Sequence, residues 1–236
     1  GLVNGETIIS LTSAIVNNKN VSANGSNYVT AITKGDGTAT VNNYYITASY
    51  NTSSGSTQNT ATINPKTLTV TGTVAPVKTY DGTNVITITG GVLSGIKNSD
   101  SITLTQAGTY NSVNAGTGIV LTMNDSISGT DAANYNLTQP TVTGTINKAP
   151  LGITVSGTYS GSTTLSAPTF TVTGLVNSET ITSLTSATLN SKDVANNSTN
   201  YVTAIAINVG SATASNYQIS QAYNASAGTT QNTVTL

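Results

Sequence analysis

The chain repeats itself at an offset of about 173 residues, and this internal repeat limits the possible folds more than any other feature of the sequence. Residues 1–63 and 174–236 align without gaps and are identical at more than half of the aligned positions. GLVNGETIISLTSA at Gly1 to Ala14, for example, returns as GLVNSETITSLTSA at Gly174 to Ala187. Such similarity marks two copies of one structural module, as in tandem repeat proteins. The repeat therefore indicates a fold of small units rather than one large domain.

The middle of the chain is a more distant relative of the same module. GIKNSDSI at residues 95–102 is similar to GLVNSETI, and an Asn-Tyr pair recurs in every copy. Two Thr-Ile-Asn stretches, at residues 62–64 and 145–147, each lie near a proline and mark the joints between copies. The sequence thus predicts three modules, which we call the first, middle and third copies: 1–64, 65–147 and 148–236. We expect the first copy to lack its opening strand and the third to end where another joint would begin.

Period-two hydrophobic patterns predict an all-β protein. Strands are predicted around four sets of residues: Leu68, Val70 and Val74; Val85, Ile86 and Ile88; Leu151, Ile153, Val155 and Tyr159; Phe170 and Val172. The best helix candidates, residues 13–23 and 186–195, are weakened by asparagine and β-branched residues. Short strands separated by glycine-containing turns favour small modules of β-sandwich or β-grasp type, which we expect to form an elongated array.

The composition excludes several classes of function. Charged residues make up 6% of the chain, the formal net charge is -1, and there is no His and no Cys. Without a cluster of basic residues we expect no nucleic-acid binding, and without an apolar run of roughly 20 residues we expect no membrane insertion of this segment. Catalysis by Ser-His or Cys-His pairs is excluded, as are disulfides and thiolate metal sites. We therefore expect no enzyme activity and no cofactor.

The motif KTYDGT contains Tyr80, Asp81 and Gly82 and predicts a tight turn. Glycine tolerates positive φ, and aspartate hydrogen-bonds to nearby backbone N–H groups. In the third copy the motif becomes TYSGST, with Ser160 in place of the aspartate. Serine can make the same turn bond but is a poor calcium ligand, so a turn is favoured over a metal site. A calcium site that combines Asp36, Asp125 and Asp131 is a less favoured alternative, because the eight acidic residues form no dense cluster.

Two further sets of residues recur. The Asn-Tyr pairs are Asn43-Tyr44, Asn134-Tyr135 and Asn216-Tyr217, and they suit either a tyrosine hydroxyl bonded to backbone, as in a tyrosine corner, or a ring that stacks on a sugar. Their recurrence in both kinds of module favours the structural role. Glu6 and Lys19 recur as Glu179 and Lys192. They predict either a surface salt bridge or, with lower weight, an internal Lys-Asn cross-link assisted by the carboxylate.

Several segments together resemble known repeats of large bacterial surface adhesins. The middle copy, with KTYDGT, GGVLSGIKNSDSITLT at residues 90–105 and AANYNLTQPTVTGTI at residues 132–146, closely resembles the YDG repeat. The flanking copies, with TVTGLVNSETITSLTSA at residues 171–187, resemble the MBG domain that alternates with it.

This resemblance implies a secreted, extracellular chain at the cell surface or in the matrix, where tandem modules form a stalk or filament. Its implied partners are neighbouring modules of the same chain or fibre. A second hypothesis is an adhesive module that binds surface glycans, matrix polysaccharide or a protein through loop Tyr, Asn and Asp residues.

Overall fold

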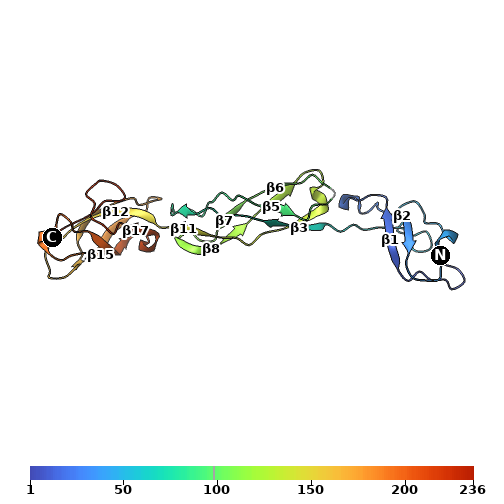
Figure 1. The fold of residues 1–236 in the computed structure, drawn as a ribbon, viewed down its shortest axis with the longest axis horizontal. Coiled ribbons are helices and arrows are strands. Elements are labelled where there is room, and N and C mark those ends of the chain that lie inside the picture. Colours follow the sequence, from blue (N-terminus) through green and yellow to red (C-terminus); the bar gives the residue numbers. More distant parts are fainter. Residues whose placement is uncertain (98) are drawn as a thin grey trace. The chain divides into compact units, whose positions relative to one another are not determined.

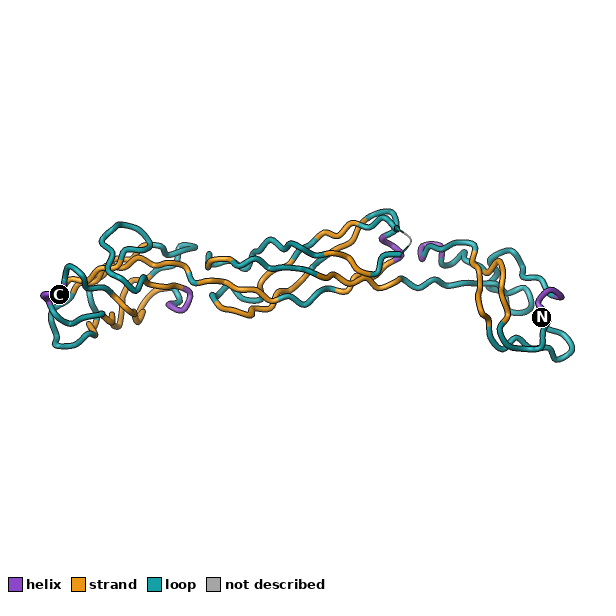
Figure 2. The backbone as a smooth tube through the Cα atoms, in the orientation of Figure 1, coloured by secondary structure: helices purple, strands orange, loops and turns teal. Residues whose placement is uncertain are grey.

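A computed structural model describes residues 1–97 and 99–236. Strands and loops make up nearly all of these residues, together with short 3-10 turns (Figure 2). The described residues contain no α-helix, and thus no helix long and apolar enough to cross a membrane. The prediction of an all-β protein built from several small sheets is confirmed.

The chain divides into two compact units. The first comprises Gly1–Thr71, Val92–Thr105 and Asp125–Gln139, and the second comprises Gly72–Gly91, Gln106–Asn124 and Pro140–Leu236. The predicted middle copy therefore contributes to both units, while the first copy lies in the first unit and the third copy in the second. Each sheet lies within a single unit.

The first unit contains three small sheets (Figure 1). One pairs β1 (Leu11–Val16) with β2 (Val29–Lys34) in antiparallel orientation. In the second sheet β3 (Lys66–Thr71) is central, parallel to β10 (Tyr135–Thr138) and antiparallel to β5 (Val92–Ser94). The third sheet pairs β6 (Thr103–Thr105) with β9 (Ser126–Ser128). The 3-10 turns are Val21–Ala23, Val41–Asn43 and Ala132–Asn134.

The second unit also contains three sheets. The first has the order β4 (Lys78–Thr79), β11 (Thr143–Asn147), β8 (Gly116–Met123) and β7 (Gly108–Tyr110). In the next, β12 (Ala149–Ser156) pairs with β14 (Thr169–Thr173), β17 (Tyr217–Ile219) and β18 (Asn232–Thr235). The last has the order β13 (Thr164–Ser166), β15 (Ile181–Leu189) and β16 (Val202–Gly210). The 3-10 turns are Val194–Asn196 and Ala214–Asn216.

The alternating aliphatic residues of β12 form the centre of the core in the third copy. Leu151, Ile153 and Val155 are almost completely buried and belong to one hydrophobic cluster with Leu184 and Val202 of the facing sheet. A strand that is paired on both edges and covered by another sheet needs aliphatic side chains, and β-branched residues suit it best. The strand predicted at this site is therefore confirmed.

Several residues predicted to lie in strands, among them Val74, lie outside them. Residues 85–88 do not form a strand, because the chain here pairs only through single bridges, such as Val85 with Thr109, and Val85 is exposed. The two weak helix candidates form no α-helix, and each consists of the end of a strand followed by a 3-10 turn. Tyr159 lies beyond the end of β12 and is exposed.

Candidate functional site

Each of the three copies builds the same small site around the tyrosine of its Asn-Tyr pair, and we call this site the tyrosine clasp. In each clasp the tyrosine hydroxyl accepts a backbone N–H and donates to a carboxylate. The N–H donors are Val3, Lys97 and Val176, each at 3.1 Å from the hydroxyl of Tyr44, Tyr135 and Tyr217, respectively. The acceptors are Glu6, Asp100 at 2.8 Å and Glu179 at 2.7 Å, in the same order.

A four-residue turn places both the N–H donor and the acid of each clasp. The N–H of Glu6, Asp100 and Glu179 donates to the carbonyl three residues earlier, at 3.0, 2.9 and 2.9 Å. In the first copy the two central residues have positive φ, 53° at Asn4 and 70° at Gly5. Turns with both central residues at positive φ favour Asn and Gly, which the sequence supplies at this position.

In the middle and third copies, the asparagine before the clasp tyrosine connects the copy to the one before it. Asn134 Oδ1 accepts the backbone N–H of Val21 at 2.8 Å, and its Nδ2 donates to Asn20 Oδ1 at 3.2 Å. Lys19 adds ion pairs from the first copy, with Nζ 3.2 Å from Asp100 Oδ1 and 3.9 Å from Asp131 Oδ1. The clasp acid of the middle copy is therefore also the anchor for the first copy.

The joint between the middle and third copies follows the same plan with different groups. Asn216 Oδ1 accepts the N–H of Ala115 at 2.9 Å, and its Nδ2 donates to Asn114 Oδ1 at 3.0 Å. In place of a lysine, the hydroxyl of Tyr80 donates to Glu179. The rings of Tyr80 and Tyr217 meet edge to face, with centroids 5.5 Å apart and an interplanar angle of 82°. Glu179 thus accepts two phenols, one from each copy.

The KTYDGT motif is both a turn and part of this joint. Asp81 Oδ1 accepts the N–H of Thr83 at 2.9 Å and its hydroxyl at 2.8 Å, which confirms the predicted turn, and Lys78 Nζ lies 2.8 Å away. Gly82 has a φ of 75°, and a Cβ at this position would lie 2.8 Å from Cβ of Asn177 in the third copy. Glycine is therefore required both by the turn and by the close approach of the next copy.

The variant motif in the third copy keeps the turn. Ser160 Oγ accepts the N–H of Ser162 at 3.4 Å, a longer bond than that of Asp81. As predicted from the sequence, serine replaces aspartate as the acceptor for a backbone N–H two residues further along the chain. The carboxylate at this position is thus a turn group that can be exchanged for a hydroxyl.

The clasp groups have shifted pKa values. Burial, together with the bond to Glu179, raises the pKa of Tyr217 to about 12. The pKa of Tyr80 is also raised, mainly by burial and then by Glu179. The hydrogen bond from Tyr135, supported by Lys19, lowers the pKa of Asp100. Each shift favours a neutral phenol beside a carboxylate, so the protonation states match the observed hydrogen bonds.

Within the described residues, the predicted Glu-Lys salt bridges and the calcium site of three aspartates do not form. Glu6 and Glu179 bind tyrosines, and Lys19 pairs with aspartates of the middle copy instead of with Glu6. Within residues 1–97 and 99–236, no three acidic residues lie close enough to share a metal ion, so Asp36, Asp125 and Asp131 do not form a site there. Lys192 is exposed. The acid-tyrosine pairing was missed, although a spacing of 38 residues from Glu6 to Tyr44 and from Glu179 to Tyr217 signals it.

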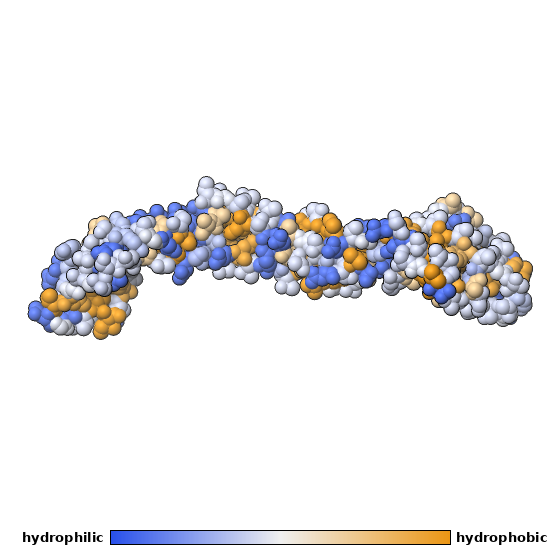
Figure 3. Space-filling view, turned by 180° about the vertical axis from the view of Figure 1, so that it is seen from behind, coloured by the Kyte–Doolittle hydropathy of each residue, from blue (hydrophilic) through white to orange (hydrophobic). Residues whose placement is uncertain are grey.

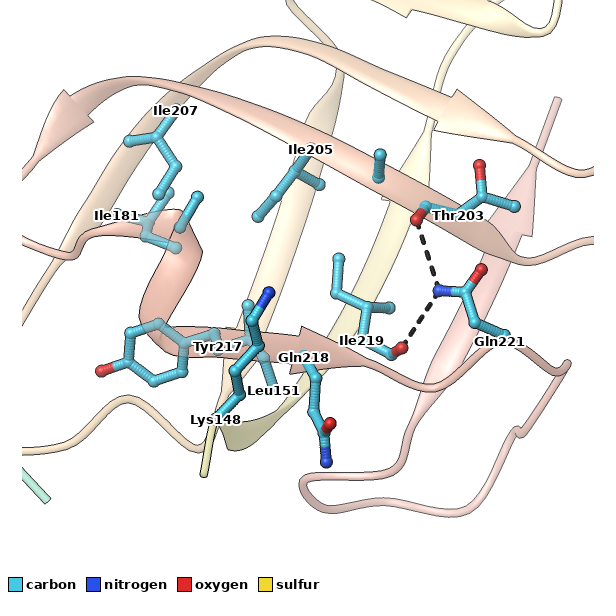
Figure 4. Close-up of a pocket in the computed structure, with 12 residues that line it drawn as sticks. Lys148, Leu151, Ile181, Thr203, Ile205, Ile207, Tyr217, Gln218, Ile219 and Gln221 are labelled. Carbon is cyan, nitrogen blue, oxygen red and sulfur yellow. Dashed lines mark hydrogen bonds between the residues drawn. The ribbon is translucent and has the colours of Figure 1, made fainter. Parts of the chain in front are cut away.

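A hollow of about 420 Å³ lies between β16 and β17 of the third copy (Figure 4). Its lining is mainly aliphatic and includes Ile205, Ile207 and Ile219. Gln221 Nε2 donates to the carbonyls of Thr203, at 3.3 Å, and Ile219, at 3.1 Å, and so links the two strands at one end. The hollow gathers no carboxylates, and its Tyr217 is already engaged in the clasp. Its chemistry is that of a gap at a sheet edge rather than of a polar binding site.

Comparison with known families identifies part of the chain. Residues 64–143 match the family model of the YDG domain, so the chain contains a YDG domain over these residues. The match includes the KTYDGT turn and the tyrosine clasp of Asp100 and Tyr135, and it covers nearly the same residues as the predicted middle copy. No curated protein and no solved structure matches the chain.

Proposed function

We propose that this chain, which contains a YDG domain at residues 64–143, is a non-catalytic structural segment of a large bacterial surface adhesin. In this proposal the protein is exported to the cell surface or the extracellular matrix, where modules joined in series form a stalk or filament. The observation that carries the proposal is the use of one docking plan at two successive joints. At each joint an asparagine and a clasp acid bind groups of the preceding copy.

A docking plan of this kind limits how far neighbouring copies can bend. A single hydrogen bond contributes only about 0.5–1.5 kcal/mol net. Covalent linkage, however, keeps the two sides at a high effective concentration, so a few weak bonds are enough to hold a joint closed. At the second joint the two hydrogen bonds of the Asn216 side-chain amide act together with the hydrogen bond from the Tyr80 hydroxyl to Glu179. A stalk needs this type of contact, because a flexible joint would not transmit length or stiffness.

The surroundings of the clasp tyrosines support a structural role over a sugar-binding one. Tyr135 is 7% exposed and Tyr217 is 5% exposed, so their rings offer little surface for stacking on a sugar. Their hydroxyls are bonded to both backbone and carboxylate. The partners we propose are therefore neighbouring modules of the same chain or fibre. The lack of His and Cys and the scarcity of charge support a role without catalysis.

Electron microscopy of the cells that make the protein tests the proposal. Gold-labelled antibodies raised against residues 1–236 should decorate thin threads outside the cells, and pre-adsorption with the purified chain should remove the label. Label confined to the cell interior, or to isolated compact particles, would contradict the proposed role. The control for folding is an antibody that recognises only the native purified chain.

A further inference from the structure

The middle copy begins and ends on parallel strands. The chain enters this copy through β3 and β4 and leaves it through β10 and β11. β10 is hydrogen-bonded to β3 in parallel, with Tyr135 opposite Lys66 at the start of both strands. β11 is hydrogen-bonded to β4 in parallel, with Ile146 opposite Lys78. The entering part of the chain is therefore paired with the leaving part twice, once in each compact unit.

The third copy has the same arrangement within one sheet. Its first strand, β12, lies parallel to its last strand, β18. The N–H of Ile153 donates to the carbonyl of Gln231 at 2.8 Å. Beyond the other end of the pair, the N–H of Gly157 donates to the carbonyl of Thr235 at 3.1 Å. Two copies with only distantly similar sequences thus share a parallel pairing of their first and last strands.

Parallel first and last strands determine how tension along the chain loads the sheet. Tension pulls the first strand backward at its N-terminal end and the last strand forward at its C-terminal end. Two parallel strands are then drawn past each other along their length, so the evenly spaced hydrogen bonds between them bear the load together. In an antiparallel pair the same tension would act at one end of the pair and would break the bonds one after another.

Buried side chains also hold the paired strands in register. Leu68 of β3, Tyr135 of β10 and Ile146 of β11 are buried. The opposite face carries exposed threonines, such as Thr69 of β3 and Thr138 of β10, which lie opposite each other. Threonine has an intermediate hydropathy, and pale colours predominate on the face of the molecule seen in Figure 3. A slip by one residue would turn the buried side chains toward solvent, so the strands resist partial sliding.

We propose that the parallel first and last strands of the middle and third copies bear tension along the chain. We call them the shear pairs: β3 with β10 and β4 with β11 in the middle copy, and β12 with β18 in the third. Their function is to keep each copy folded while the chain is pulled from both ends. Tension arises in the stalk proposed above, so this function rests on that role. Weak shear pairs would leave labelled threads outside the cells unaffected, and the two proposals therefore fail separately.

Single-molecule force measurements on the full chain test the pair of β3 and β10. The chain contains no Cys, so two introduced cysteines define where the force acts. Asn64→Cys, before β3, is combined either with Thr141→Cys, after β10, or with Thr130→Cys, before β10. All three residues are exposed. The first combination loads the pair in shear, and the second is the matched control that peels the same two strands apart from one end.

The lifetime of the folded sheet at one constant force should be at least about tenfold longer in shear than in peeling, because several hydrogen bonds must break together and forced unfolding follows the unfolding rate. Equal lifetimes, or a longer lifetime in peeling, would overturn the proposal for the middle copy. Both double variants should melt at the temperature of the parent chain, which confirms that the handles leave the fold intact.

The third copy gives a second, independent measurement. A cysteine at Lys148 combined with one added after Leu236 loads β12 and β18 in shear, whereas Lys148→Cys with Ala227→Cys pulls both strands from their N-terminal ends. Lys148 and Ala227 are exposed. We expect the lifetime at constant force to be longer in shear here as well. A ratio of one or less would refute the load-bearing role of this pair.

Discussion

Residues 1–63 and 174–236 have closely similar sequences but differ in how much of each segment becomes sheet. Tyr217–Ile219 is a strand that pairs with β12, whereas residues 44–46 are not, although Ile46 matches Ile219. Leu184 is in the core and Leu11 is at the surface. A strand is stabilised by its neighbours, and its propensity depends on them far more than helix propensity does. The difference between the copies is therefore a difference in partners, not in local sequence.

The polar contacts of the two copies, in contrast, are nearly the same. Both have the tyrosine clasp, and in both a buried asparagine, Asn59 or Asn232, hydrogen-bonds to the backbone of β2 or β16. These bonds connect groups within residues 1–63 or within 174–236, so they need no further segment. Hydrogen bonds between side chains and backbone thus hold the loops of both copies in the same conformation. In the third copy the strand β12 then completes the sheet.

The largest difference in stability should be that between variants of Leu184 and of its counterpart Leu11. Leu184→Ala removes a buried side chain and should cost about 2–5 kcal/mol of the stability of the third copy. Leu11→Ala removes an exposed one and should change stability by less than about 0.5 kcal/mol. Urea denaturation followed by hydrogen exchange in residues 181–189 and 11–16 measures the two effects separately. Equal losses would show that Leu11 is also buried in solution.

The next difference concerns the joint asparagines. Asn216→Ala removes two hydrogen bonds to the middle copy and leaves the N–H of Ala115 without its partner, so we expect a loss of about 1–3 kcal/mol. The side chain of Asn43 has no hydrogen-bond partner within the described part of the chain, and Asn43→Ala should be nearly neutral. Thermal unfolding of both variants gives the comparison. A large loss of stability in Asn43→Ala would mean that the Asn43 side chain already has a hydrogen-bond partner in solution.

Local and periodic features could be predicted from the sequence, and contacts over long distances only in part. The Asp81 turn and the aliphatic alternation of β12 follow from residue chemistry over a few positions. The hydrogen bond between Glu179 and Tyr217 joins residues 38 apart, whereas the recurring sequence pattern places each of them in a separate pair, Glu179 with Lys192 and Tyr217 with Asn216. Nothing within a short window fixes such a partner. The contact of Tyr80 with Glu179 could not be predicted either, because a turn motif does not indicate that its tyrosine hydrogen-bonds to the next copy.

Alkaline pH should weaken the third copy through its clasp. The pKa of Tyr217 is raised to about 12, from about 10 for an unperturbed tyrosine. A raised pKa in the folded state means that the contribution to stability is complete below about pH 10 and is lost as the pH rises through 12. Tyr217→Phe should reduce this dependence on pH and leave the part that comes from Tyr80, whose pKa is also raised. Circular dichroism between pH 9 and 12 measures it, and an unchanged profile in the variant would assign the loss to other tyrosines.

The smallest difference should be that between Lys19 and Lys192. Lys19 pairs with Asp100 and Asp131 across the first joint, and its side chain is 64% exposed. Exposed ion pairs contribute little and are screened by salt. Lys19→Ala should therefore lower the melting temperature of the first unit by less than Asn216→Ala lowers that of the second, and high salt should erase the loss. Lys192→Ala should leave the melting temperature unchanged at both low and high salt.

Acid pH should weaken the same joint, between the first and middle copies. The bonds from Tyr135 and Lys19 lower the pKa of Asp100, so its contribution is present above about pH 4 and is lost as the pH falls through the lower value of the folded state. Melting curves of the parent chain and Lys19→Ala at pH 7 and pH 2, each in low and high salt, separate the two causes. If the effect of Lys19→Ala persists at pH 2 or in high salt, the lysine acts through packing of its aliphatic stem, and the first joint does not depend on charge.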